Sequence, residues 1–239
     1  MTGPAILAGA CAAAGGAAGV MAYAVRGRSS SLLAPSVHHG DRRRAAIALT
    51  FDDGPSESTS ELLGILSKHN APATFFQCGV SARRLPGVCR EVAAAGHEVG
   101  NHTDTHPMLY FKSSGFIQRE LAAAQEAIVT ASGVTPRYFR APYGVRWFGL
   151  RQAQARLNLM GVMWTTIGVD WKLPVDEVVK RLLRGARNGA IFCLHDGRSI
   201  EVRPNIRVTL DAVRQAIPKL ADRGFRFETI STILCPTTN

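Results

Sequence analysis

Short apolar runs alternate with amphipathic segments along most of the chain. The runs are apolar at nearly every position, which is typical of strands buried on both faces of a parallel sheet. The predicted strands cover Ala45–Phe51, Ala73–Gly79, Glu98–His102, Tyr138–Ala141, Leu159–Thr166, Ala190–His195 and Phe225–Ile230. Apolar residues at helical spacing lie between them, most clearly in Ser58–Lys68, Phe116–Ala131 and Pro204–Arg223.

This alternation predicts an α/β fold with a parallel sheet. Seven strand–helix units in about 190 residues fit a closed barrel, and an open doubly wound sheet fits them equally well. Neither GxGxxG nor a P-loop motif opens any helix, so the usual signature of a nucleotide-binding fold is missing.

Ionisable residues stand where several predicted strands end. In an α/β barrel the carboxyl ends of the strands share one rim, so we expect these side chains to converge there. They are Asp52 and Asp53 after the first strand, His102 after the third, Arg140 in the fourth, Asp170 past the fifth and His195 at the end of the sixth.

His102 and His106 are separated by three residues. On a helical turn, or on a loop of similar shape, both imidazoles face one side and can bind one metal ion. Thr103 stands where zinc proteases of the HExxH type carry glutamate, so a base must come from elsewhere. Asp104 offers a third ligand, but a helical turn would direct it to another side. Alone, such a histidine pair is more often structural.

Adjacent carboxylates at Asp52 and Asp53 precede a predicted sharp turn at Gly54 and Pro55. Neighbouring residues at a strand end point in different directions, so the two acids can have different roles. One can complete a metal site with the two histidines, and the other can deprotonate an attacking water molecule. In the alternative interpretation, Asp53 or Ser56 caps the following helix.

Three further strand-end residues can assist such chemistry. Arg140 can keep a carboxylate ionised through a bidentate ion pair. His195 can protonate a leaving amine, and Asp170, if it reaches the imidazole, would raise its pKa and fix its orientation. Taken singly, Arg140 can equally well be a surface arginine, and a lone histidine at a strand end, such as His195, is more often structural.

The N-terminal segment differs from the rest of the chain. Pro4–Val25 has no charged residue and is long enough to cross a bilayer, although Ala and Gly make it weakly apolar and the basic start of a secretory signal is missing. We interpret residues 1–25 as a membrane anchor or an atypical export signal, residues 26–44 as a basic linker and residues 45–239 as the folded domain. A cell-envelope location follows, although Arg26 and Arg28 alone favour a cytoplasmic domain.

Charge and cysteine content narrow the function classes. The chain has 28 Lys and Arg against 18 Asp and Glu, a net charge of +10. No basic run with interleaved aromatic residues marks a nucleic-acid groove, so we expect no nucleic-acid partner, and a basic module that binds an anionic polymer stays as an alternative. The five cysteines lack metal-binding spacing. Cys78 and Cys193 lie in apolar runs and are predicted core residues.

Taken together, the motifs resemble those of the polysaccharide deacetylase family, also called carbohydrate esterase family 4 or the NodB homology domain. The resemblance extends from Ala45 to about Ile233. Each motif is weak alone, but five in this order and spacing are specific. They are TFDDGP at 50–55, HTDTH at 102–106, RAPYG at 140–144, Asp170-Trp171 and Leu194-His195.

The resemblance implies a distorted (β/α)7 barrel that removes acetyl groups from an N-acetylated glycan such as peptidoglycan or a chitin-like oligomer. By matching position, Asp52 would be the general base. Asp53, His102 and His106 would bind one divalent metal ion, most often zinc, with cobalt as another option. Hydrolysis of a small non-sugar amide on the same scaffold is the alternative activity.

The remaining roles also follow from the resemblance. Arg140 would orient the base, and His195 would be the general acid, tuned by Asp170. The backbone N–H of one residue would hold the oxyanion, and two side chains would shape the acetyl pocket. These three residues are Tyr143, Trp171 and Leu194, respectively.

Overall fold

The computed structural model describes the backbone of residues 3–235 and the side chains of residues 15–235. Its parallel strands form one curled sheet in the order β1-β6-β5-β4-β3-β2-β8-β7, with β9 also paired to β2. The strands are β1 (Ser36–Val37), β2 (Ala46–Asp52), β3 (Ala73–Gln77), β4 (Glu98–Asn101), β5 (Tyr138–Phe139), β6 (Met160–Val162), β7 (Thr166–Ile167), β8 (Ala190–His195) and β9 (Arg226–Phe227).

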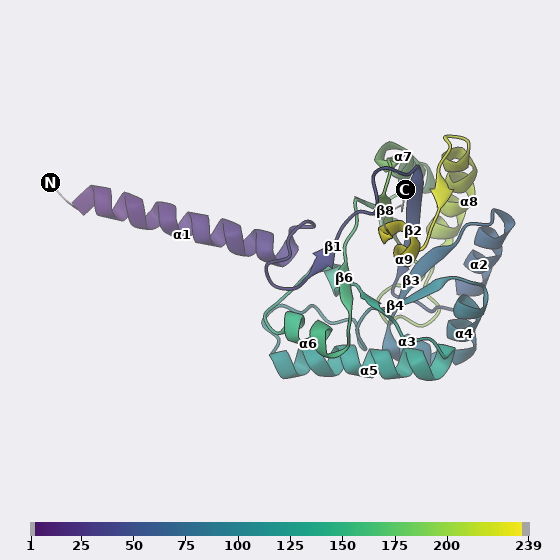
Figure 1. The fold of residues 1–239 in the computed structure, drawn as a ribbon, viewed down its shortest axis with the longest axis horizontal. Coiled ribbons are helices and arrows are strands. Elements are labelled where there is room, and N and C mark those ends of the chain that lie inside the picture. Colours follow the sequence, from purple (N-terminus) through teal and green to yellow (C-terminus); the bar gives the residue numbers. More distant parts are fainter. Residues whose placement is uncertain (1–2, 236–239) are drawn as a thin grey trace.

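Helices α2 to α8 lie around the outside of the curled sheet, whereas α1 projects away from it and α9 packs against the interior cluster (Figure 1). The α-helices are α1 (Gly3–Arg26), α2 (Thr59–Lys68), α3 (Gly79–Arg84), α4 (Pro86–Ala94), α5 (Ser114–Ser132), α6 (Leu150–Arg156), α7 (Val175–Gly185), α8 (Arg207–Ala221) and α9 (Ile230–Leu234). A short 3-10 helix, η1, spans Pro142–Gly144. Strands β2 to β8 supply seven barrel strands, so the distorted (β/α)7 barrel is confirmed and the doubly wound sheet is not.

Side chains of β2 alternate between two environments. Ile47 and Leu49 pack in the main core with residues of α2, α7 and α8, whereas Ala46 and Ala48 pack in a smaller cluster inside the barrel. Side chains of a strand repeat with a period of two, so Asp52 lies on the interior side with the two alanines. The whole strand is buried, as its continuous apolar run predicts.

Strand β8 follows the same rule. Phe192 and Leu194 belong to the main core beneath the helices, whereas Ile191 belongs to the interior cluster. Cys193 and His195 have the parity of Ile191 and therefore face the interior. Small residues on the interior face of β2 leave space there, and the two strands direct their polar ends toward that space.

Residues 26–44, expected as a basic linker, lie against the folded domain in part. Strand β1 pairs with β6. The Arg146 guanidinium donates to the Ser30 carbonyl at 2.7 Å and also to the carbonyl of Gly27. Helix α1 runs outward from the body of the molecule (Figure 1). Within the described residues, none of the helices has both the length and the apolar character needed to span a membrane.

Two predicted strands differ from the structure. The run Leu159–Thr166 divides into β6, which pairs with β5 and β1, and β7, which pairs with β8. The chain between them crosses from one edge of the curled sheet to the other, and a continuous apolar run carries no sign of that crossing. The run Phe225–Ile230 contains only the short β9, and α9 begins at its last residue.

The cysteines are described apart from Cys11, which lies outside the described side chains. Cys78, Cys89 and Cys193 are buried free thiols, and Cys235 is an exposed one. The prediction that Cys78 and Cys193 are buried is confirmed. Burial raises the pKa of the Cys78 and Cys193 thiols well above the usual range, so these two thiols are uncharged at neutral pH.

Candidate active site and metal centre

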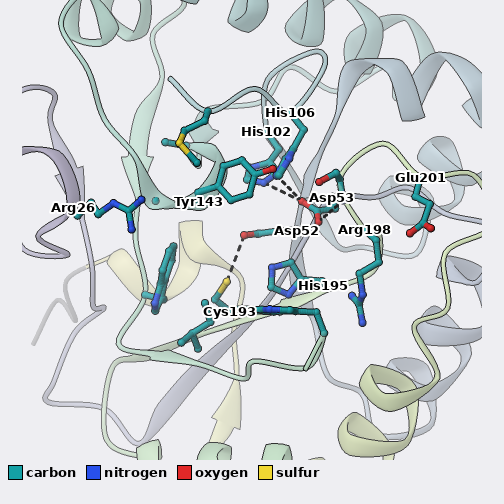
Figure 2. Close-up of a pocket in the computed structure, with 17 residues that line it drawn as sticks. Arg26, Asp52, Asp53, His102, His106, Tyr143, Cys193, His195, Arg198 and Glu201 are labelled. Carbon is teal, nitrogen blue, oxygen red and sulfur yellow. Dashed lines mark hydrogen bonds and ion pairs between the residues drawn. The ribbon is translucent and has the colours of Figure 1, made fainter. Parts of the chain in front are cut away.

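A cavity of about 630 Å³ opens where the strands end, and its volume is within the range of about 300–1,000 Å³ that is usual for ligand pockets (Figure 2). Most of the side chains that the sequence singles out line it. They are Asp52, Asp53, His102, His106, Tyr143, Trp171 and His195. Arg140 and Asp170 lie behind the wall, where they bond to Asp52 and His195.

Three buried side chains form a candidate metal centre. Asp53 Oδ1 lies 3.3 Å from His102 Nε2 and 3.0 Å from His106 Nε2. One ligand atom from each residue lies within 4.8 Å of the other two. Figure 2 shows the three groups turned toward one another, Asp53 from the loop after β2 and both histidines from the loop after β4. Two imidazoles and one carboxylate are a ligand set used by catalytic zinc sites, which leave further positions open.

The proton positions around His102 also suit a cation. Its Nδ1 lies 2.8 Å from the Arg140 carbonyl, which can only accept, so Nδ1 carries the proton and Nε2 presents a lone pair toward Asp53. Asp53 Oδ2 accepts from the Ser199 N–H at 2.7 Å, whereas Oδ1 forms no directional hydrogen bond with the described residues. A cation between a lone pair and a carboxylate oxygen would satisfy both.

Asp53 is ionised despite its burial. Burial by itself would raise the pKa of this carboxyl, but positive charge and N–H donors at His102 and His106, when these rings are protonated, lower it well below the usual range, and a bound cation would act in the same direction. Its backbone is left-handed, with a φ of 76°, a conformation that costs a residue other than glycine on the order of 1–3 kcal/mol. The helix-capping alternative is wrong for Asp53, because α2 has Ser58 at its N-cap and this carboxylate faces the histidines.

The histidine motif forms a loop rather than a helical turn. Thr103 has a φ of 67° and His106 a φ of 56°, so a regular helix is excluded. The Glu120 carboxylate on α5 accepts from the backbone N–H of Asp104 at 3.0 Å and holds the loop. The Asp104 side chain turns away from the centre and pairs with Arg83 at 2.7 Å. Of the two histidines and Asp104, only the histidines face the metal centre.

Asp52 is held by a buried arginine and a thiol. Arg140 Nη1 donates to Asp52 Oδ1 at 2.7 Å and to Thr50 Oγ1 at 2.6 Å. The predicted bidentate pair is therefore a single contact, because the same guanidinium also donates to the Val162 carbonyl. The Cys193 thiol donates to Asp52 Oδ2 at 3.4 Å, so both carboxylate oxygens have fixed partners.

His195 lies on the strand next to Asp52 and pairs with a second buried acid. The register of β2 and β8 puts Asp52 directly opposite His195. Asp170 Oδ1 lies 2.8 Å from His195 Nδ1, and Asp170 Oδ2 accepts from the His195 backbone N–H and from the Thr209 hydroxyl. Burial would lower the imidazole pKa, but Asp170 raises it to about 9. The ring is therefore protonated at neutral pH.

Two aromatic residues frame the mouth of the cavity. Tyr143 is 54% exposed and Trp171 is 49% exposed. The Tyr143 ring lies 4.8 Å from the His106 ring, and the Trp171 ring lies 4.9 Å from the His195 ring, both edge to face. Tyr143 also has a left-handed backbone, with a φ of 57°. Exposed rings beside charged groups are suited to stacking on sugar rings.

Leu194 does not lie on the cavity wall. Its side chain is fully buried in the main core beneath the helices, because β8 directs alternate residues to opposite faces. The apolar wall comes instead from residues that the sequence did not single out, including Met108, Trp164 and Ile167. Cys193 has the same parity as His195 on β8, so strand alternation is sufficient to predict that it faces the cavity. No sequence signal identifies Ser199, whose backbone N–H donates to Asp53.

Such a site at the strand ends of a parallel α/β barrel is that of a hydrolytic enzyme. Comparison with known proteins defines the class further. Residues 39–162 match the family model for polysaccharide deacetylase. A chitooligosaccharide deacetylase from Sinorhizobium fredii is 37% identical over 188 residues, which cover 75% of this chain and 87% of the relative. The chain belongs to the polysaccharide deacetylase family, whose members hydrolyse N-acetyl groups.

Solved structures agree with this assignment. A peptidoglycan N-acetylglucosamine deacetylase has a TM-score of 0.77 and 30% identity, covering 82% of this chain and 91% of that one. A Bacillus anthracis protein described as a family 4 pseudoenzyme has a TM-score of 0.76 and 27% identity, covering 85% and 69%. This fold also occurs in a protein described as a pseudoenzyme, so the fold alone does not establish activity. Activity therefore depends on the residues of the site.

Proposed function

We propose that the chain removes the acetyl group from N-acetylglucosamine residues of an oligosaccharide or polysaccharide. One observation carries this proposal: an arginine-paired carboxylate, an aspartate-paired imidazole and a His-His-Asp cluster all converge on one cavity. The relatives named chitooligosaccharide deacetylase and peptidoglycan N-acetylglucosamine deacetylase support this substrate class.

Asp53, His102 and His106 would hold one divalent ion, with zinc as the first choice because of the donor types. Such an ion polarises an acetyl carbonyl and lowers the pKa of water close to it. The chain contributes orientation: the Arg140 carbonyl fixes the His102 tautomer, and the Ser199 N–H fixes the Asp53 carboxylate.

Asp52 acts as the general base that removes a proton from the attacking water. Arg140 and Cys193 hold its two oxygens, so the carboxylate meets the water in a fixed orientation. General bases of this kind contribute about 10²–10⁴-fold to a rate. The adjacent acids thus divide the work, with Asp53 bound to the ion and Asp52 left to accept a proton.

His195 acts as the general acid that protonates the departing sugar amine. Asp170 occupies its Nδ1, so Nε2 is the nitrogen left to face the cavity. A pKa of about 9 keeps this proton available at neutral pH, when the leaving amine needs it. The backbone N–H of Tyr143 stabilises the oxyanion, while the exposed rings of Tyr143 and Trp171 bind the sugar.

Acetate release from an uncharged N-acetylglucosamine tetramer tests the proposal. The full chain is expected to release acetate, to lose this activity after chelation, and to regain it when zinc or cobalt is added. A panel of small cyclic and linear amides, assayed in parallel, tests the alternative activity on the same scaffold. Hydrolysis of those amides with no acetate released from the tetramer would overturn the proposal.

A further inference from the structure

The cavity continues away from the metal centre into a second hollow of about 500 Å³. The two hollows share five lining residues: Arg26, Tyr143, Gly144, Trp164 and Ile167. They therefore form one groove. A sugar whose acetyl group reaches the metal centre would have its neighbour along this groove, beside Tyr143 and Trp164.

The far end of the groove is lined by Arg28 and Arg181, and Arg26 lies where the two hollows meet. Arg28 Nη1 donates to the Thr165 carbonyl at 2.7 Å, and Arg181 Nε donates to the Ile167 carbonyl at 3.1 Å. These contacts hold the guanidinium groups of Arg28 and Arg181 against the backbone at the two ends of β7. A carbonyl does not neutralise a guanidinium, so both keep their full charge and further N–H groups for a ligand.

The two ends of the groove differ in their acidic residues. No acidic residue lines the second hollow, and no carboxylate among the described residues lies within ion-pair distance of its three arginines. The metal centre has Asp52 and Asp53, and the cavity around it is also lined by Glu201, Arg198 and the protonated His195. Figure 2 shows Arg26 on the opposite side of the pocket from Glu201.

The three arginines lie outside the segment that matches the family model. Arg26 and Arg28 precede residues 39–162, which match the family model, and Arg181 on α7 follows them. Asp170 and His195 also follow the matched region, so only the segment that carries Arg26 and Arg28 is set apart from the catalytic residues. Hydrogen bonds from Arg146 to the carbonyls of Gly27 and Ser30 hold the segment that carries Arg26 and Arg28 in place.

We infer that this end of the groove is a subsite for an anionic substituent, a carboxylate or a phosphate, on the sugar next to the one that is deacetylated. The inference rests on the proposed function and specifies its substrate: a charged glycan is preferred over a neutral one. Guanidinium groups bind both anions through paired N–H donors. Trp164 and Tyr143 supply aromatic surfaces between the reacting sugar and the charged one.

The test compares substrates of equal length. One tetramer carries lactyl carboxylates on alternate sugars, a second is the same tetramer with those carboxylates amidated, a third carries 6-phosphates, and a fourth is the unsubstituted chitotetraose. The measured quantity is the ratio of kcat/KM between each charged tetramer and its uncharged counterpart. We expect at least one ratio to exceed about tenfold at low salt and to fall as ionic strength rises.

The full chain carrying Arg28→Gln and Arg181→Gln together is expected to lower that ratio about tenfold. A matched control is Arg90→Gln with Arg119→Gln, which removes the same charge from exposed positions on α4 and α5 that line neither hollow. The control is expected to keep the ratio. A carboxylate preference and a phosphate preference both support the subsite and identify its anion.

Failure of the anionic subsite and failure of the deacetylase function would give different results. If the protein deacetylates charged and uncharged tetramers equally, or if the control lowers the ratio as much as the Arg28 and Arg181 variant, the subsite is overturned and the deacetylase function stands. If none of the four tetramers releases acetate, the proposed function itself fails.

Discussion

The two ends of the groove are built in different ways. At the catalytic end, side chains from the buried ends of β2 and β8 are held by internal partners such as Arg140 and Asp170. At the basic end, Arg26 and Arg28 are exposed and come from a segment that precedes the barrel strands. Strand parity therefore directs the polar side chains of β2 and β8 into the cavity, whereas the exposed segment at the basic end has no such constraint.

Loss of a metal ligand is expected to have the largest effect at the catalytic end. His106→Ala removes one of three donors, and since a bound ion supplies several kcal/mol of stabilisation to the transition state, acetate release is expected to fall about 10³-fold. Zinc content per chain should fall in parallel. His69→Ala is the control, because His69 is exposed at the end of α2 and lies outside the cavity. Full activity in His106→Ala would contradict the ligand assignment.

Loss of the Asp170 charge is expected to shift the pH profile. Asp170→Asn removes the main influence that raises the His195 pKa, whereas burial, which lowers it, remains. The alkaline limb of kcat/KM is expected near pH 9 in the unmodified protein and at least one unit lower in the variant, with about a tenfold loss of rate on that limb for each unit. Thr209→Val is the control, since it removes one partner of Asp170 but keeps the carboxylate.

The same pair contributes to stability in a defined pH window. The His195 pKa is raised in the folded state, so its contribution is complete below the ordinary pKa of about 6.5 and is lost as pH rises through about 9. The Asp170 pKa is lowered, because its pairing with His195 outweighs burial, so its contribution is lost only as pH falls below the ordinary range. Unfolding experiments on Asp170→Asn at pH 7 should show reduced stability, and an unchanged midpoint would argue against the pair.

Neighbouring residues of β8 should respond in opposite ways. Leu194→Ala leaves a core cavity and is expected to lower the free energy of unfolding by about 2–5 kcal/mol, with turnover per folded molecule changed less than twofold. Cys193→Ala removes the thiol beside Asp52 and is expected to lower kcat about two- to fivefold, with a smaller effect on stability. Denaturant unfolding and acetate release separate the two. The reverse pattern would contradict the assigned parity.

The sequence predicted the part of the molecule that depends on periodicity. Buried parallel strands appear as apolar runs, and the polar residues that end them meet at one rim, so the sequence alone predicts that Asp52 and His195 lie close together. Of the two shapes predicted for the histidine motif, the loop is present and the helical turn is not, because Glu120, distant in sequence, accepts from the backbone of that loop.

Other features depend on contacts that no local pattern encodes. Strand β1 has two residues and exists because it pairs with β6, so the linker sequence shows no strand signal. Ser199 acts through its backbone N–H, which is independent of its side chain. Leu194, which the family motif places at the acetyl pocket, has its side chain in the main core, as strand alternation next to His195 requires.

The division of labour between Asp52 and Asp53 is the central claim, and one paired measurement tests it directly. Zinc per chain and acetate release are determined together for Asp52→Asn and Asp53→Asn, two isosteric changes at adjacent positions. We expect Asp52→Asn to retain one zinc ion and to lose acetate release about 10²–10⁴-fold, and Asp53→Asn to lose the zinc. Zinc lost from Asp52→Asn but retained by Asp53→Asn would contradict the assignment.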